Sequence, residues 1–222
     1  MKVILFGATG MVGKGVLLEC LDHKKVEKVL AIGRSPVEIE HPKLEQLKHE
    51  NLMDLDSIKN EFSNYDACFF CIGVSAAGMN EASYSRITYN YTLNVAKTLH
   101  DLNPEMTFTY VSGQGTDSSE NGRIMWARVK GKTENDLLKM GFNKAIMFRP
   151  GIIIPKRGIK SKTKLYQFFY DYFMWLLLII KSISPNSVTD TTRMGKAMIN
   201  AHLHGKEQSI LNPGDINELA EQ

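Results

Sequence analysis

Cysteine is scarce in this chain of 222 residues, which has only Cys20, Cys68 and Cys71. Three cysteines at these positions cannot build a disulfide framework, so the expected setting is the reducing cytoplasm. Cys68 and Cys71 form a CxxC pair inside one strand-like run, where positions three apart point to opposite faces. No second pair completes a metal site, so we expect no bound metal and two core side chains.

An excess of charge of either sign and a long apolar run are also missing. Lys and Arg number 27 against 24 Asp and Glu, a net charge of +3 that argues against a nucleic-acid partner and suits a small anionic ligand. The uncharged apolar run at 172–180 is much shorter than the roughly twenty residues of a transmembrane helix. The first expected strand begins within the first three residues, so we expect no signal peptide.

What the sequence does contain is a glycine-rich turn near its start. An apolar run over residues 3–6 leads into Gly7, Gly10 and Gly13, and the pattern predicts a helix directly afterwards, at about 11–22. This spacing is typical of a dinucleotide-binding turn. The first glycine lets the strand turn sharply, the second lets the backbone approach a diphosphate, and the third lets the helix pack closely.

The start of that helix predicts where the diphosphate binds. Unpaired backbone N–H groups and the positive end of the helix dipole attract an anion. We therefore expect the diphosphate to lie on Gly10, Met11 and Val12.

The rest of the chain alternates between strand and helix patterns without repeats. The expected strands lie at about 28–33, 44–50, 67–72, 107–112, 144–148 and 210–212. The expected helices run from Asp54 or Asp56 to 62, then at about 81–102, 124–140, 191–202 and 216–220. This alternation predicts an α/β fold with a doubly wound parallel sheet, the Rossmann fold, in a single domain over residues 1–222.

The turn after the second expected strand bears on the choice of cofactor. Proteins that prefer NAD usually have an acidic residue here, which binds the ribose 2′-hydroxyl. This chain has Arg34 and Ser35 instead, a guanidinium and a hydroxyl that suit a 2′-phosphate. NADP(H) is therefore favoured over NAD(H), with an exposed turn arginine as the alternative interpretation.

Several motifs together resemble a known family. They are the glycine turn, Asn51-Leu52, the serine that ends the strand at 107–112, and Arg149-Pro150-Gly151. These features resemble the atypical and extended short-chain dehydrogenase/reductases. The stretches 111–117 and 129–134 are most similar to the Tat-interacting-protein-like oxidoreductase branch. The expected cofactor-binding residues are Gly7, Thr9, Gly10, Met11, Val12, Gly13, Arg34, Ser35, Asn51, Leu52, Ile72, Gly73, Lys130 and Pro150.

The resemblance also implies a catalytic set of serine, tyrosine and lysine. The tyrosine and lysine stand four residues apart on one helix face. In that family the tyrosine exchanges a proton with the substrate oxygen, the lysine lowers the pKa of the tyrosine and holds the ribose, and the serine orients the carbonyl. Here Ser112 and Lys130 match, but Trp126 occupies the tyrosine position. An indole N–H can donate a hydrogen bond but cannot exchange a proton near neutral pH.

The region at about 155–205 is expected to form a small C-terminal helical lobe inserted near the end of the domain. Its residues 165–180 carry apolar and aromatic side chains at helical spacing, after a basic stretch at 156–164. Three interpretations of this helix stay open: a lid over the nicotinamide, a homodimer interface, or a contact with a membrane surface.

Three functions are compatible with these features. The first is an NADPH-dependent reductase of a small carbonyl compound. In it, Ser112 and Lys130 orient the substrate and water or another hydroxyl replaces the tyrosine. The second is a catalytically silent module that senses the dinucleotide, which Trp126 favours. The third and weakest is a nucleotide-sugar epimerase or dehydratase, because a short chain has little C-terminal lobe to hold a sugar nucleotide.

Overall fold

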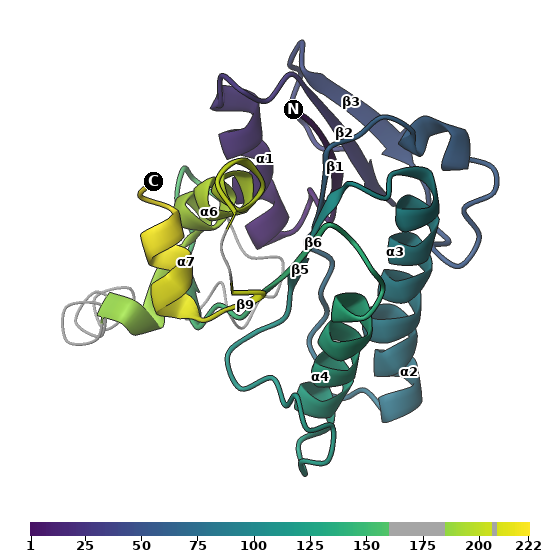
Figure 1. The fold of residues 1–222 in the computed structure, drawn as a ribbon, viewed down its shortest axis with the longest axis vertical. Helices are drawn as coiled ribbons and strands as arrows, with labels where there is room; N and C mark the ends of the chain where they lie inside the picture. The colour runs from purple at the N-terminus through teal and green to yellow at the C-terminus, as the bar shows by residue number, and fades with distance from the viewer. Residues whose placement is uncertain (160–184, 206–207) are drawn as a thin grey trace.

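The computed structural model describes residues 1–159, 185–205 and 208–222, and a seven-stranded sheet runs through them (Figure 1). The strand order is β3-β2-β1-β4-β5-β6-β9, and each neighbouring pair is parallel. The strands are β1 (Lys2–Phe6), β2 (Lys28–Gly33), β3 (Leu44–Lys48), β4 (Ala67–Phe70), β5 (Thr107–Val111), β6 (Lys144–Phe148) and β9 (Ile210–Leu211). The order reverses between β1 and β4, which is the switch point where ligands bind in such sheets. The predicted Rossmann fold is confirmed.

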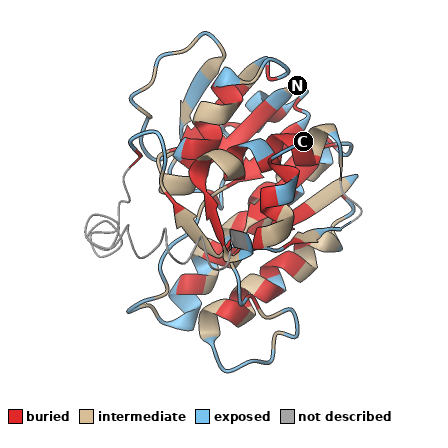
Figure 2. Cartoon of the chain, turned by 90° about the vertical axis from the view of Figure 1, so that its left-hand side faces the viewer, coloured by how far each residue is buried: buried red, intermediate tan, exposed pale blue. Residues whose placement is uncertain are grey.

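Helices cover both faces of this sheet. Figure 1 shows α1 (Met11–Asp22), α6 (Thr191–Leu203) and α7 (Pro213–Leu219) on one side, and α3 (Tyr91–Leu102) and α4 (Met125–Leu138) on the other. Side chains of β1 alternate between the two cores. Val3 and Leu5 join the core under α1 and α6, while Ile4 and Phe6 join the core under α3 and α4. A strand buried on both faces explains the continuous apolar run at the start of the chain (Figure 2).

The helix expected at about 81–102 is present but is not regular along its length. It consists of α2 (Glu81–Ser85), a π-helical turn (Arg86–Asn90) and α3. Asn80 caps its start, because its Oδ1 accepts a hydrogen bond from the Ser83 N–H at 2.8 Å. The short helix expected from Asp54 or Asp56 is reduced to a 3₁₀ turn, η1 (Lys59–Phe62).

A second, smaller sheet follows β6. It pairs β7 (Ile152–Ile154) in parallel with β8 (Val188–Asp190), next to the 3₁₀ turn η3 (Pro185–Ser187). The sequence analysis did not predict this pair, because three-residue strands are too short to show a period.

The described part of the expected C-terminal lobe packs against the first helix. Asp190 caps α6 by accepting a hydrogen bond from the Arg193 N–H at 2.8 Å, at the start of the helix expected at 191–202. A Cβ on Gly15 of α1 would stand 2.5 Å from the Thr191 Cβ, and one on Gly195 would stand 2.7 Å from the Glu19 Cβ. Glycine therefore permits the close approach of α1 and α6. The apolar stretch 165–180 lies outside the described residues. The three interpretations of it (lid, homodimer interface or membrane contact) therefore stay predictions.

The two cysteines of the CxxC motif point to opposite cores. Cys68 is buried under α3 and α4, and Cys71 packs against the core under α1 and α6. Within the described parts of the chain, no group of His, Cys, Asp and Glu side chains is placed to hold a metal ion. Those same parts contain no helix with the length and hydropathy needed to cross a bilayer.

Candidate functional site

The glycine turn brings the start of α1 directly onto the end of β1. Gly7 has φ +86°, a conformation that favours glycine, and the Gly10 N–H donates to the Gly7 carbonyl at 2.9 Å. A Cβ on Gly13 would stand 2.1 Å from the Gly7 oxygen. The turn and the helix can therefore pack this closely only with glycine at position 13.

The first turn of α1 is left free to bind an anion. Its N-cap is Gly10, which has no side chain to cap the helix, and the first turn carries no acidic residue. The N–H groups there are orphan donors at the positive end of a 12-residue helix. This arrangement fits a diphosphate held by backbone amides.

Two cavities lie on either side of this turn. The first has a volume of 520 Å³ and is lined by Gly10, Met11, Val12, Cys71, Ile72, Gly73, Val111, Ser112, Gly113, Gln114, Lys130, Pro150, Gly151, Ile152 and Ile153. The second has a volume of 200 Å³ and is lined by Gly7, Ala8, Thr9, Ala31, Ile32, Gly33, Ser35, Pro36, Val37, Gln46, Leu47 and Lys48. If the diphosphate of a dinucleotide lies on the turn, each of the two cavities has room for one of its nucleosides.

Most of the residues expected at the cofactor line one of these cavities. Gly10, Met11, Val12, Ile72, Gly73, Lys130 and Pro150 line the first, and Gly7, Thr9 and Ser35 line the second. Asn51 and Leu52 line neither. The Leu52 carbonyl instead accepts a hydrogen bond from Asn94 Nδ2 of α3 at 2.8 Å, which fixes this segment against that helix.

Arg34 lies at the edge of the second cavity rather than in its wall. Its neighbours Gly33 and Ser35 line the cavity, whereas the Arg34 side chain is exposed and makes no hydrogen bond or ion pair with the described residues. Lys48, unlike Arg34, is a cation in the cavity wall itself, and it forms an ion pair with Glu50 at 3.3 Å.

The three residues of the expected catalytic set are not brought together. Ser112 and Lys130 line the first cavity, and the Lys130 Nζ donates a hydrogen bond to the Ser112 carbonyl. Trp126 is absent from the cavity wall. Its ring packs against Gly115, with Cη2 at 3.5 Å from the position of a Cβ there.

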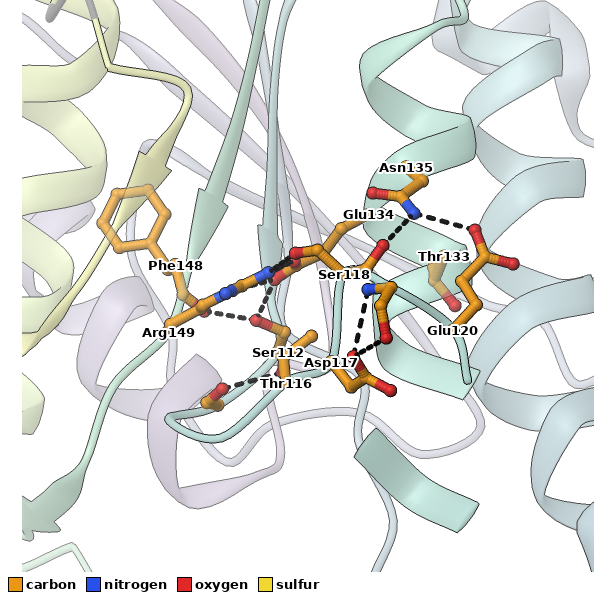
Figure 3. A network of polar contacts seen from close by, with 12 residues as sticks. Ser112, Thr116, Asp117, Ser118, Glu120, Thr133, Glu134, Asn135, Phe148 and Arg149 are labelled. Atoms are coloured by element: carbon orange, nitrogen blue, oxygen red, sulfur yellow. Dashed lines mark hydrogen bonds and ion pairs between the residues drawn. The ribbon is translucent and has the colours of Figure 1, made fainter. Parts of the chain in front are cut away.

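A buried carboxylate lies directly beneath this site (Figure 3). Glu134 is 0% exposed, and its carboxylate accepts hydrogen bonds from Arg149 Nε at 3.1 and 3.0 Å. The hydroxyl of Ser112 also donates to Glu134 and lies 3.1 Å from the Phe148 carbonyl. A serine hydroxyl has one proton, so Ser112 in this arrangement has none left to offer a ligand in the cavity.

Sequence reasoning missed the role of Glu134. Glu134 stands four residues after Lys130 on α4, a spacing that is typical of a surface ion pair on a helix. In the structure the Glu134 carboxylate pairs with Arg149 instead, because the end of β6 meets α4 at this point. The signal available in the sequence was a charged residue on the apolar face of a helix.

The surroundings shift the pKa values of two ionisable side chains in the cavity wall, Lys130 and Cys71. Burial lowers the pKa of Lys130 to about 8, while the nearby charge of Glu134 acts in the opposite direction. Burial raises the pKa of the Cys71 thiol, which therefore stays protonated. Glu134 cannot neutralise Lys130 directly, because Arg149 and Ser112 already occupy its oxygens.

Comparison with known proteins agrees with this geometry. Residues 3–120, just over half of the chain, match the NAD dependent epimerase/dehydratase family. Protein FMP52, mitochondrial, from Meyerozyma guilliermondii is 25% identical over 190 residues, which are 85% of this chain and 76% of that protein. Protein HTATIP2 from Rattus norvegicus is 27% identical over 158 residues, which are 70% of this chain and 64% of that protein. The resemblance to the Tat-interacting-protein-like branch is confirmed.

Solved structures share the fold at low sequence identity. A UDP-N-acetylglucosamine 4-epimerase from Methanobrevibacter ruminantium is 16% identical with a TM-score of 0.71, covering 99% of this chain and 80% of that one. The Bordetella bronchiseptica enzyme WbmF, solved with NAD⁺, is 12% identical with a TM-score of 0.67, covering 99% of this chain and 77% of that one. The chain belongs to the NAD-dependent epimerase/dehydratase family, with a Rossmann fold and a nicotinamide dinucleotide as its cofactor.

Proposed function

We propose that the protein is an NADPH-dependent reductase of a small carbonyl compound. The observation that carries the proposal is the first cavity, whose wall contains both the free amides of Met11 and Val12 and the half-buried Lys130. When bound there, the reduced nicotinamide supplies a hydride. The remaining wall is largely apolar, with Val111, Ile152 and Ile153, and suits a small substrate of low polarity.

Different residues of the chain bind the different parts of the cofactor and substrate. The turn amides hold the diphosphate, and Lys130 lies within reach of a substrate or ribose oxygen in the same cavity. In this proposal Ser112 does not contact the substrate but positions two neighbouring side chains. Its carbonyl holds the Lys130 ammonium, and its hydroxyl holds Glu134. This differs from the direct contact with the carbonyl that the resemblance implies.

NADPH rather than NADH is the proposed reductant because cations flank the second cavity. Ser35 and Lys48 line it and Arg34 stands at its edge, whereas no acidic side chain is among the described residues of its wall. An acid at this place would bind a ribose 2′-hydroxyl and repel a 2′-phosphate.

Replacing Arg34 by Asp should reverse this preference. Losing a charged hydrogen-bonding partner of the 2′-phosphate costs about 1.5–3 kcal/mol, so NADPH affinity should fall roughly 10- to 100-fold while NADH affinity changes little. Isothermal titration calorimetry with both coenzymes measures this. Lys48→Ala is the matched variant. Equal losses for NADPH and NADH in Arg34→Asp would refute the assignment, and a selective loss only in Lys48→Ala would move it to Lys48.

A second candidate function rests on Trp126. The structure places its ring against Gly115 and outside the cavity wall, so this position offers no proton donor to a substrate. A protein that binds the dinucleotide without turning it over would act as a sensor of its redox state.

Oxidation of NADPH over a panel of aldehydes, quinones and ketones separates the two functions. Trp126→Tyr adds an ionisable hydroxyl four residues before Lys130 but outside the cavity wall, so the reduction rate should stay close to that of the wild type. A rise of roughly tenfold or more would show that position 126 reaches the substrate. Trp126→Phe is the matched control and should leave the rate unchanged. Oxidation of NADPH by the wild type supports the reductase. If the wild type and both Trp126 variants bind the dinucleotide tightly and none of them oxidises it, the sensor is supported. A nucleotide sugar in the panel tests the epimerase alternative.

A further inference from the structure

Reduction of a carbonyl requires a proton at its oxygen, and the cavity must contain a group that can give it. Trp126 cannot, because an indole N–H does not ionise near neutral pH. The Ser112 proton is held by Glu134 beneath the cavity. The donor must therefore be sought among the other side chains of the cavity wall.

Only two ionisable side chains, Cys71 and Lys130, are among the described residues of that wall, apart from the hydroxyl of Ser112. Cys71 is half-buried, with its sulfur 4.0 Å from the Met198 sulfur, and the loss of hydration raises the pKa of its thiol. A thiol in that environment does not give up its proton near neutral pH. Lys130 is the remaining group.

The position of Lys130 suits a proton donor. An ammonium has three protons, and one of them is used in the hydrogen bond to the Ser112 carbonyl, which fixes Nζ at the end of β5. Lys130 forms no ion pair with a described carboxylate, since Arg149 and Ser112 hold Glu134. Two N–H bonds are thus free for oxygens in the cavity.

We propose that the Lys130 ammonium donates the proton to the carbonyl oxygen of the substrate, in place of the tyrosine that this chain lacks. In this step a Lys130 N–H bond breaks and its electron pair stays on Nζ. An O–H bond forms on the product as the hydride completes the C–H bond. Lys130 then regains a proton from water. The proposal rests on the proposed reductase function.

The charges around Lys130 are consistent with this role. Burial lowers the pKa of Lys130 to about 8, so the group is mostly protonated at neutral pH and releases a proton far more readily than an exposed lysine. Glu134 lies on the same helix and opposes this shift. Arg149 from the end of β6 pairs with Glu134, the first turn of α1 carries no acidic residue, and the neutral Cys71 thiol follows β4.

The test compares wild type with Lys130→Arg, which keeps a positive charge and hydrogen-bond donors but does not release a proton. We expect carbonyl reduction to fall about 10²- to 10⁴-fold, while dinucleotide affinity measured by calorimetry changes by only a few-fold. In the wild type the rate should fall as the pH rises through about 8, where the ammonium is lost.

A second readout does not depend on activity. In protein labelled with [¹³C]lysine, the Cε resonance missing from Lys130→Met belongs to Lys130 and should titrate near pH 8, well below the exposed lysines. The proposal is overturned if the Lys130 Cε resonance titrates at the same pH as those of the exposed lysines, or if Lys130→Arg reduces carbonyls at close to the wild-type rate. Either result leaves the reductase function in place. If the wild type binds the dinucleotide but reduces no carbonyl in the panel, the proposed function and this proposal both fail.

Discussion

Replacing Glu134 by alanine should lower the free energy of unfolding by about 3–5 kcal/mol, the usual cost of removing one partner from a buried ion pair. The Glu134 carboxylate is fully buried and accepts hydrogen bonds from Arg149 and Ser112. Its loss leaves the Arg149 guanidinium, which is largely buried, without a counter-charge and the Ser112 hydroxyl without its acceptor. Urea unfolding followed by circular dichroism measures the change.

Two further variants separate the loss of the buried ion pair from a general sensitivity of α4 to substitution. Lys132→Ala removes an exposed ion pair to Asp136 on the same helix, with a nitrogen–oxygen distance of 2.9 Å, and should cost less than about 1 kcal/mol. The double variant Glu134→Leu with Arg149→Met removes both charges and should regain much of the loss. A Glu134→Ala protein no less stable than Lys132→Ala would show that the buried pair does not hold the strand ends to α4.

The same pair connects stability to the candidate site. Glu134 links α4 to the ends of β5 and β6, and Lys130 lies one turn earlier on α4 with its ammonium on the Ser112 carbonyl. Mutations of Glu134 should therefore alter both folding and the environment of Lys130. For this reason the tests of proton donation use Lys130 itself.

The fold could be predicted from the sequence because its signals are local. Apolar runs bounded by turn residues mark the strands, and the glycine spacing marks the approach of α1 to β1. The CxxC motif was correctly predicted to lie in the core, because alternation along a strand sends its two side chains to opposite faces. Ser112, Lys130 and Pro150 reach one cavity because each follows or faces the carboxyl end of a strand.

The rest depends on contacts between distant segments, which a single sequence does not reveal. The partner of Glu134 is Arg149, which reaches it through the pairing of β5 with β6, whereas helical spacing suggested Lys130. The packing of Trp126 against Gly115 depends on the path of the loop after β5. The π-helical turn at Arg86–Asn90 has no counterpart in the pattern of apolar residues.

Replacing Gly13 by alanine should abolish dinucleotide binding and destabilise the protein. The new Cβ would stand 2.1 Å from the Gly7 oxygen and 2.7 Å from the Gly7 carbon, both backbone atoms that cannot move aside as a side chain can. The start of α1 must shift, at about 1–3 kcal/mol or more. The amides of Met11 and Val12 would move with it and lose their alignment with the diphosphate. Calorimetry with NADPH should show at least a roughly 100-fold loss of affinity, since charged hydrogen bonds contribute about 1.5–3 kcal/mol each.

Gly10→Ala separates the loss of binding from the loss of stability. Its Cβ would stand 3.3 Å from the Gly7 oxygen, a contact that a shift of a few tenths of an ångström relieves, so the melting temperature should stay close to that of the wild type. Gly10 lines the first cavity, however, and the added methyl group would occupy the place of the diphosphate. Gly214→Ala in α7, whose Cβ would make an ordinary 3.5 Å contact with Asn186, should change neither property. Wild-type affinity in Gly10→Ala would mean that the diphosphate does not lie on this turn, because a methyl group and a phosphate cannot share that space.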